Sequence, residues 1–327
     1  MKKINFVKGI AISVLLGFAT SAIAKDPIVI QVNNTMKPGG SEEVAIAAFS
    51  EYLDKHAPGG FKTIPFLSGQ LGGENAVLEL LNIGQTQISL TASNWRTQYA
   101  PEYDPISIPF LFPSNESIAA YMETDSGKRL EEIAKNKGGI IHLGVQNRAA
   151  RHMTANKRID SPEDLAGFKL RLPGVPVWVD VWEAIGAQPV IVPAPEIYLA
   201  MSTGQVDGHE NSLASPYNRK LEEVQSHLIM TSHVYSPWHW VASRDWWNTL
   251  SAEDQNIIKD AVNVAKKVGS DAEATKDKFY LLELQKKGME VVYPDRELFK
   301  TKAQLAIANA MQNLAPGVVE DIEKVIK

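Results

Sequence analysis

The feature that most limits how this chain can fold is a long helical pattern in its C-terminal third. Ser251 is a typical helix N-cap residue, and apolar residues recur at helical spacing from Ile257 to Val268. Gly269 alone interrupts the pattern before Gly288, and no proline does. A helix of roughly 30 residues is about 45 Å long, which exceeds the width of a small lobe. We therefore expect this helix to lie across two lobes.

The length of the chain and the order of its elements indicate an α/β protein with two lobes. A chain of 327 residues is too long for one compact core. Strand-like and helix-like segments alternate along it, as is typical of α/β proteins. The expected strands cover residues 28–32, 61–67, 87–91, 140–145, 168–172, 188–192 and 291–293. Helices are expected after N-caps at Ser41 and Ser161, over 75–82 and 117–135, and over most of 299–327.

The connection between the lobes is expected to consist of several ordered crossings. The sequence has no internal repeat, no low-complexity tract and no linker rich in serine and glycine. Such an arrangement suits a hinge. Gly269 is either a point where the long helix bends or a glycine required for close packing.

The first 24 residues have the pattern of a cleaved export signal. Lys2, Lys3 and Lys8 precede an apolar run at 10–19, and residues 22–24 supply a cleavage site of small residues. We expect the mature chain to begin at Lys25. No later stretch approaches the roughly 20 apolar residues of a membrane helix, so a released, soluble protein is expected. The chain has no cysteine, which excludes disulfides, thiolate metal sites, cysteine nucleophiles and lipid attachment.

Composition and motifs disfavour several classes of function. A net charge of -5 argues against binding nucleic acid or an anionic membrane. The chain lacks G-x-S-x-G, H-E-x-x-H, phosphate-loop and dinucleotide-binding patterns. Its histidines are scattered among strand-like segments, where a hydrogen-bonded structural role is more common than catalysis. These absences lower the expectation of an enzyme without excluding one.

An ordered series of motifs resembles one family of transport proteins. The motifs lie at residues 70–74, 108–112, 151–159, 161–173, 186–189, 195–198, 200–204 and 206–211. In this order they resemble the substrate-binding proteins of tripartite ATP-independent periplasmic (TRAP) transporters, the DctP-type family. The resemblance covers essentially the whole mature chain. It implies a two-lobed, periplasmic-binding-protein-like fold with a hinge, located in the periplasm, without catalytic activity or a cofactor.

The resemblance also implies partners and a division into lobes. The protein would be a monomer that closes over a small organic acid and delivers it to the small and large membrane subunits of a TRAP permease. The first lobe would comprise residues 25–148 and 237–276. The second lobe would comprise residues 149–236 and 277–327.

Two arginines are the main candidates for holding the acid. Arg171 lies at a strand end just before Pro173, where its planar side chain could clamp a carboxylate in a cleft or pair with a surface acid. The resemblance favours the clamp. It also implies that Arg151 is a second ligand contact, with Arg148 as the alternative, and that Asn211 is a polar contact.

Weaker candidates follow other strand ends, where a cap or packing role is equally compatible with the pattern. The first lobe offers Asn33, Glu74, Asn94 and Trp95, and the return crossing offers Tyr235, Trp238 and His239. A metal-bridged ligand is disfavoured, because Asn211 stands where the metal-using subgroup tends to have tryptophan. Glu210 is accordingly expected to be a structural acceptor, and no metal site is expected.

The expected ligand is a sugar acid, because these polar residues offer more partners for hydroxyl groups than a plain dicarboxylate needs. A C4-dicarboxylate is the alternative ligand. Two alternative functions stay open: an exported sugar-acid hydrolase or lyase with Glu74 or His239 as base, and the binding protein of an ABC-type importer.

Overall fold

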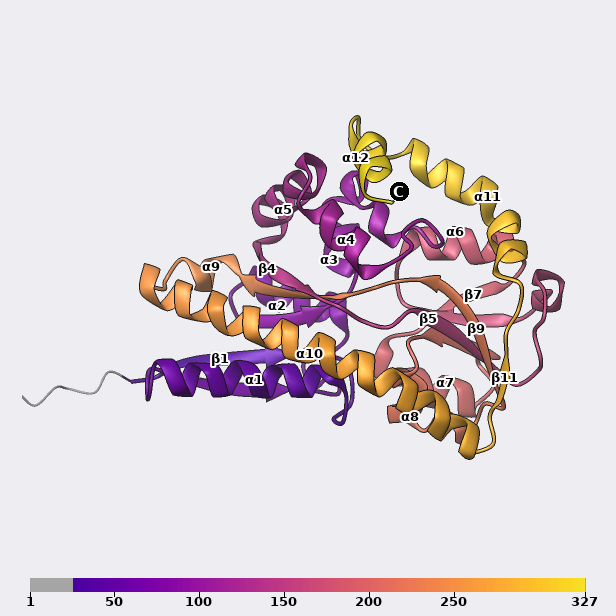
Figure 1. Ribbon diagram of the computed structural model, residues 1–327, viewed down its shortest axis with the longest axis horizontal. Helices are drawn as coiled ribbons and strands as arrows, with labels where there is room; N and C mark the ends of the chain where they lie inside the picture. The colour runs from indigo at the N-terminus through magenta and orange to yellow at the C-terminus, as the bar shows by residue number, and fades with distance from the viewer. Residues whose placement is uncertain (1–25, 327) are drawn as a thin grey trace, which may run out of the picture.

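A computed structural model describes residues 26–326 as two mixed β-sheets flanked by helices (Figure 1). The expected export signal at 1–24 and the expected start of the mature chain at Lys25 lie outside the described residues. Within residues 26–326, no helix combines the length and the apolar character that crossing a membrane requires.

The first sheet has five strands, with one late strand inserted among the early ones. β1 is parallel to β2 and β3, and β10 runs antiparallel between β3 and β4. In spatial order the strands are β2 (Phe61–Phe66), β1 (Ile28–Asn33), β3 (Ile88–Thr91), β10 (Trp238–Ser243) and β4 (Ile140–Gln146). The helices from this part of the chain are α1 (Ser41–His56), α2 (Glu74–Asn82), α3 (Asn94–Tyr99), α4 (Asn115–Met122), α5 (Asp125–Gly138) and α9 (Arg244–Trp247).

The second sheet has six strands, five from the middle of the chain and one later strand. In spatial order they are β11 (Glu290–Val292), β9 (His227–Val234), β5 (Arg151–Ala155), β8 (Gly208–Asn211), β6 (Lys169–Leu172) and β7 (Gln188–Ile191). β5 runs antiparallel to β8 and β9, whereas β6 is parallel to β7 and β8. The helices are α6 (Pro176–Ile185), α7 (Ile197–Ser202), α8 (Ala214–Arg219) and α11 (Arg296–Gln312). We refer to the two sheets with their helices as the first and second lobes.

The chain crosses between the lobes several times. It passes from β4 to β5, returns from β9 to β10, and crosses again along α10 (Ala252–Lys286). This helix, orange in Figure 1, packs against α1 and β4 and, further along, against α8. The side chain of Ser251 accepts a hydrogen bond from the backbone of Asp254, as expected of an N-cap. Leu284 near its end joins the same apolar cluster as Ile258 near its start.

Two local expectations are wrong. The capping box of Ser161 and Asp164 forms, but it opens only one 3₁₀ turn, Pro162–Leu165. Gly167 then takes a left-handed conformation with φ of 73°, which turns the chain into β6. The first helix begins at Ser41 with Gly40 as its N-cap, so Ser41 does not cap it.

The C-terminal helix also departs from the expected division into lobes. α12 (Val318–Val325) packs against α4 and α5, and Val318 and Ile322 belong to an apolar cluster of the first lobe. The backbone of Ala315 donates to the carbonyl of Glu102 just before this helix. The end of the chain therefore returns to the first lobe, because α12 buries its apolar side there, and residues 277–327 do not all pack on the second lobe.

Gly269 permits close packing at the middle of α10. The helix is continuous over its 35 residues, and Gly269 is among its buried positions. A Cβ atom at residue 269 would lie 2.5 Å from the side-chain carboxamide of Gln146. That carboxamide is itself held, since its Oε1 accepts a hydrogen bond from Nε1 of Trp240 at 3.1 Å. Close contact between α10 and β4 therefore accounts for the glycine.

We predict that Gly269→Ala lowers the free energy of unfolding by about 1–3 kcal/mol, because the added methyl group overfills the contact with Gln146. At an open helix position the same change would raise it by up to about 1 kcal/mol. Thr275→Ala, on the exposed side of α10, is the matched control and should change stability by less than about 1 kcal/mol. Urea unfolding of the three proteins measures the difference. A stabilising Gly269→Ala would contradict the packing role.

Candidate ligand-binding site

A cavity rich in arginine lies where the two lobes meet. The first lobe and the crossing to β5 contribute Thr35, Met36, Glu74, Ala92, Ser93, Asn94, Arg148 and Trp238. The second lobe contributes Arg151, Arg171, Pro173, Trp178, Ala194, Asn211 and Arg219. A wider groove continues from this cavity between residues 69–76 and 191–196. The polar groups of both lobes therefore face one enclosed space with a route to the outside.

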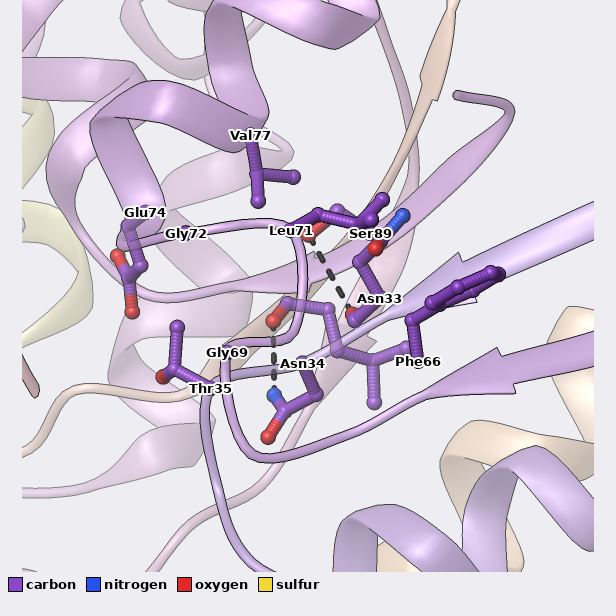
Figure 2. A pocket seen from close by; sticks show the side chains of 11 residues that line it. Asn33, Asn34, Thr35, Phe66, Gly69, Leu71, Gly72, Glu74, Val77 and Ser89 are labelled. Carbon is purple, nitrogen blue, oxygen red and sulfur yellow. Dashed lines mark hydrogen bonds between the residues drawn. The ribbon is translucent and has the colours of Figure 1, made fainter. Parts of the chain in front are cut away.

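The ends of parallel strands bring the first-lobe residues to this cavity. Thr35 follows β1, Asn94 follows β3, and Glu74 opens α2 after a glycine-rich loop. Figure 2 shows that the Glu74 and Thr35 side chains lie on the same side of this loop. Nδ2 of Asn34 donates to the carbonyl of Leu90 at 2.9 Å and ties the turn after β1 to β3. Ligands of open α/β sheets commonly bind at such carboxyl-end edges.

Arg171 is a buried cation without a carboxylate partner. Its residue is 2% exposed, and Nε and Nη2 both donate to the backbone carbonyl of Val192. Within residues 26–326, no carboxylate lies within 4 Å of its guanidinium. Burial lowers the pKa of Arg171 to about 9, with Glu210 opposing this shift and Arg151 adding to it. The side chain stays protonated at neutral pH and presents a positive charge at the cavity that has no direct carboxylate partner among the described residues.

Arg151, by contrast, is held by an internal acid. Its Nε and Nη2 donate to the two carboxylate oxygens of Glu210 at 2.6 and 2.7 Å, and its guanidinium lies 4.7 Å from the ring centre of Trp178. His233 also contacts the Glu210 carboxylate, at 3.0 Å. Burial raises the pKa of Glu210, but the charge and hydrogen bonds of Arg151 and His233 outweigh burial and hold it at about 2. Glu210 thus serves as an acceptor that fixes Arg151 at the cavity wall.

Arg148 and Asn211 form a second polar contact across the cavity wall. Nη2 of Arg148 donates to Oδ1 of Asn211 at 2.6 Å, and the guanidinium lies 4.2 Å from the ring centre of Trp238. Burial lowers the pKa of Arg148 to about 10, and the charge of Arg151 contributes to the lowering. Arg148, the alternative to Arg151 in the sequence, therefore lines the cavity together with it.

Arg219 is a cavity residue that the sequence did not indicate. It is the last residue of α8 and 4% exposed, and its Nη2 donates to the carbonyl of Thr35 at 3.2 Å. Burial lowers its pKa to about 10, and Arg148 contributes. No motif of the TRAP resemblance includes this residue, and a single arginine in a short helix carries no pattern of its own.

Glu74 and Asn94 lie at the cavity as expected. Glu74 accepts weak hydrogen bonds from Oγ1 of Thr91 at 3.2 Å and from the backbone of Ala92 at 3.4 Å. Burial raises the pKa of its carboxyl group, and the charge of Arg148 opposes the rise. Nδ2 of Asn94 donates to Oδ1 of Asn75 at 2.6 Å. Both side chains lie where a ligand group in the cavity could reach them.

Four of the expected residues lie elsewhere. Nδ2 of Asn33 donates to Thr86 and to the carbonyl of Ile88, so this amide joins β1 to β3, and Asn33 lines a separate small pocket beside Thr35 and Glu74 (Figure 2). His239 is buried between Arg96 and His142, and Trp95 packs against both histidines. Tyr235 packs against the apolar cluster under α4 and α5. Their side chains point into the first lobe, where they pack with or hydrogen-bond to neighbouring groups.

Taken together, fold and cavity define a two-lobed α/β binding protein with a cationic site between its lobes. The family model for bacterial extracellular solute-binding proteins, family 7 (DctP), matches residues 32–313. The chain belongs to this family. The family and the two-lobed fold expected from the sequence are thereby confirmed.

Three relatives illustrate the family. A TRAP solute-binding protein from a Polaromonas species, solved bound to D-erythronate, is 28% identical, with a TM-score of 0.84 over 91% of this chain and 98% of its own. One from Roseobacter denitrificans, with bound 3-deoxy-D-manno-oct-2-ulosonic acid, is 26% identical, with a TM-score of 0.85 over 92% and 100%. The C4-dicarboxylate-binding periplasmic protein of Shewanella loihica is 25% identical over 89% of this chain and 87% of its own.

The Glu210 carboxyl group predicts a pH dependence of folding. Because its pKa is about 2 in the folded protein and 4.5 ordinarily, its stabilising effect is complete above pH 4.5 and is lost as the pH falls through 2. Its contribution at neutral pH is about 3 kcal/mol. We predict that Glu210→Gln is less stable at pH 7 and loses less stability between pH 5 and about 2 than the parent does.

Urea unfolding over this pH range measures the effect. Glu132→Gln, on the exposed surface of α5, is the control and should follow the parent curve. Equal pH profiles for the parent and Glu210→Gln would show that Arg151 does not hold this carboxylate ionised.

Proposed function

We propose that this protein is a periplasmic solute-binding protein that captures a small organic acid, preferably a sugar acid, between its lobes. It delivers the acid as a monomer to the small and large membrane subunits of a TRAP permease. The observation that carries the proposal is Arg171, a buried guanidinium that lines the cavity without a carboxylate partner among residues 26–326. A carboxylate of the ligand balances the positive charge of this guanidinium.

The geometry of Arg171 suits a carboxylate group. The carbonyl of Val192 occupies Nε and Nη2, so it orients the plane of the guanidinium while contributing only a dipole. A ligand carboxylate adds the full negative charge at the remaining edge, and closure around it strengthens the pair by excluding water. Arg151, fixed by Glu210, adds a second cation at the same wall.

Several polar side chains at the cavity favour a hydroxylated acid. Ser93, Asn94, Asn211 and Glu74 can donate to or accept from ligand hydroxyl groups. The relatives with bound D-erythronate and 3-deoxy-D-manno-oct-2-ulosonic acid support a sugar acid here. The relative from Shewanella loihica supports a C4-dicarboxylate as the alternative ligand.

The same geometry offers little support for catalysis. An exported hydrolase or lyase would use Glu74 or His239 as its base, and His239 is packed inside the first lobe away from the cavity. Glu74 lines the cavity, but no histidine is among the residues around it there. Binding without turnover is therefore the proposed activity.

Ligand should raise the melting temperature. We predict that at about 1,000 times its dissociation constant the acid adds roughly 4 kcal/mol to the free energy of unfolding, because it binds only the folded state. A thermal-shift screen of monocarboxylates, dicarboxylates and sugar acids, with neutral sugars and cationic amino acids as controls, identifies it. Stabilisation by a neutral sugar or a cationic amino acid alone would contradict the proposal.

Arg171→Ala should weaken binding of the acid by roughly 30-fold to several thousand-fold, the cost of removing one partner of a buried charge pair. Arg171→Lys should recover only part of the affinity, since an ammonium cannot reproduce the planar fork. The unliganded Arg171→Ala protein should melt no lower than the parent, because a buried charge without an ion-pair partner has been removed. Titration calorimetry measures the affinities and scanning calorimetry the melting temperature, with Arg158→Ala on the exposed surface as the control. If Arg171→Ala binds the acid within about threefold of the parent, Arg171 does not hold the carboxylate, and Arg151 or Arg148 does so instead.

A further inference from the structure

We infer that Phe110, in a segment of the first lobe, is a positioning residue for ligand binding, because this segment holds the two side chains that fix Arg151 at the cavity. The inference rests on the proposed function and adds to it a residue outside the cavity. Phe110 lies in the motif at 108–112 and does not line the cavity. Its segment connects α3 to α4, so it reaches the second lobe from outside that lobe.

Phe110 packs in the second lobe, although its segment belongs to the first. Its side chain is 5% exposed and joins the apolar cluster of the second lobe that contains Trp178 and Trp182. The guanidinium carbon of Arg296 lies 5.2 Å from its ring centre. Phe112, two residues later, packs instead in an apolar cluster of the first lobe. The motif thus places one phenylalanine in the core of each lobe.

The backbone of Phe110 has a conformation that bulky residues rarely adopt. Its φ is 65°, in the left-handed region, where a Cβ atom is disfavoured. Such a conformation persists only where the surrounding structure holds it. The buried ring does so here, together with the backbone N–H, which donates to the carbonyl of His233 at 2.6 Å. A costly conformation held by two contacts to the other lobe indicates a role beyond filling space.

A first contact of this segment leads to the aromatic ring beside Arg151. The carbonyl of Ser107 accepts a hydrogen bond from Nε1 of Trp178 at 2.6 Å. The ring centre of Trp178 lies 4.7 Å from the guanidinium of Arg151. Ser107 is itself held in the first lobe, because its Oγ and its backbone N–H both donate to Asp104, which pairs with Arg96 at 2.9 Å.

A second contact leads to the acid that pairs with Arg151. The carbonyl of His233 accepts from the backbone of Phe110, and the ring of His233 contacts Glu210 at 3.0 Å. Glu210 in turn accepts two hydrogen bonds from Arg151. Both neighbours that fix the Arg151 guanidinium are therefore attached to one first-lobe segment. A shift of this segment would displace Arg151 relative to Arg171, and binding groups must be held to within about 0.5 Å.

A purely structural role for Phe110 makes a different prediction. If the ring only fills the core of the second lobe, removing it lowers stability and leaves the affinity of the folded protein unchanged. If it positions Trp178 and Arg151, the affinity falls as well. The environment of the Trp178 indole N–H then changes too, because its hydrogen bond to Ser107 depends on the same segment.

The test measures binding of D-erythronate, 3-deoxy-D-manno-oct-2-ulosonic acid and succinate by calorimetry, well below the melting temperature. Phe110→Ala should weaken binding of a recognised acid by roughly tenfold or more. Phe110→Leu, which restores most of the apolar volume, should recover most of the affinity. If the alanine variant does not fold, Phe110→Gly takes its place, because glycine adopts a φ of 65° without strain.

Phe112→Ala is the matched control. It removes a ring of the same size from the same motif, but from the core of the first lobe. Its melting temperature should fall, whereas its affinity for the acid should stay within about threefold of the parent, because Phe112 has no contact that leads to Arg151.

A double-mutant cycle shows whether Phe110 acts through Trp178. Trp178→Phe keeps an aromatic ring beside Arg151 but removes the N–H that binds Ser107, and it should weaken binding by roughly tenfold. If both residues act on one contact, the double variant should lose little more than either single variant, instead of roughly 100-fold. In the unliganded protein, the indole N–H resonance that disappears in Trp178→Phe should shift in Phe110→Ala and stay in place in Phe112→Ala.

The outcomes separate failure of this inference from failure of the proposed function. Unchanged affinity in Phe110→Ala, equal losses in Phe110→Ala and Phe112→Ala, or multiplied losses in the double variant would overturn the positioning role alone. If the parent binds none of these acids and none of the thermal-shift screen, the proposed function is wrong. The Trp178 resonance then decides whether Phe110 positions this indole, and an unshifted resonance in Phe110→Ala rejects it.

Discussion

A cluster of buried arginines between the two lobes is the constraint on which the rest of this structure depends. Arg148, Arg171 and Arg219 are each at most 4% exposed and lack an ion-pair partner within residues 26–326. Burying such cations costs several kcal/mol each unless an anion compensates them. We propose that a ligand anion supplies this compensation. The cavity is accordingly better suited to the complex than to the unliganded chain.

The two-lobed construction supplies both the cations and the means of enclosing them. The second sheet presents Arg151 and Arg171 from strands that are fixed by pairing and by Glu210, while the first lobe brings Thr35, Glu74 and Asn94 from strand ends and a helix start. The chain crossings and α10 connect the two lobes. We propose that a ligand held by both lobes binds a closed arrangement more tightly and so shifts the population toward it.

Much of this could be predicted from the sequence, and the failures have physical causes. Alternating segments predicted four of the five strands of the first sheet and three of the six strands of the second. Ser251 with its following periodicity predicted α10. Arg171, Arg151 and Asn211 lie in ordered motifs and reach the cavity. His239 does not, because successive residues of β10 face opposite sides of the sheet: Trp238 faces the cavity and Glu42, whereas His239 faces His142. Arg219 was missed because only tertiary packing brings its short helix to the cavity.

The central claim is that the ligand binds because it neutralises buried arginines, and replacing its charge without changing its shape tests this most directly. Calorimetry would compare the best sugar acid from the screen with its primary amide, which has nearly the same size and the same hydroxyl groups. The account predicts that the amide binds at least roughly 30-fold more weakly, the loss expected when a buried charge partner is removed. Equal affinities for acid and amide would contradict it.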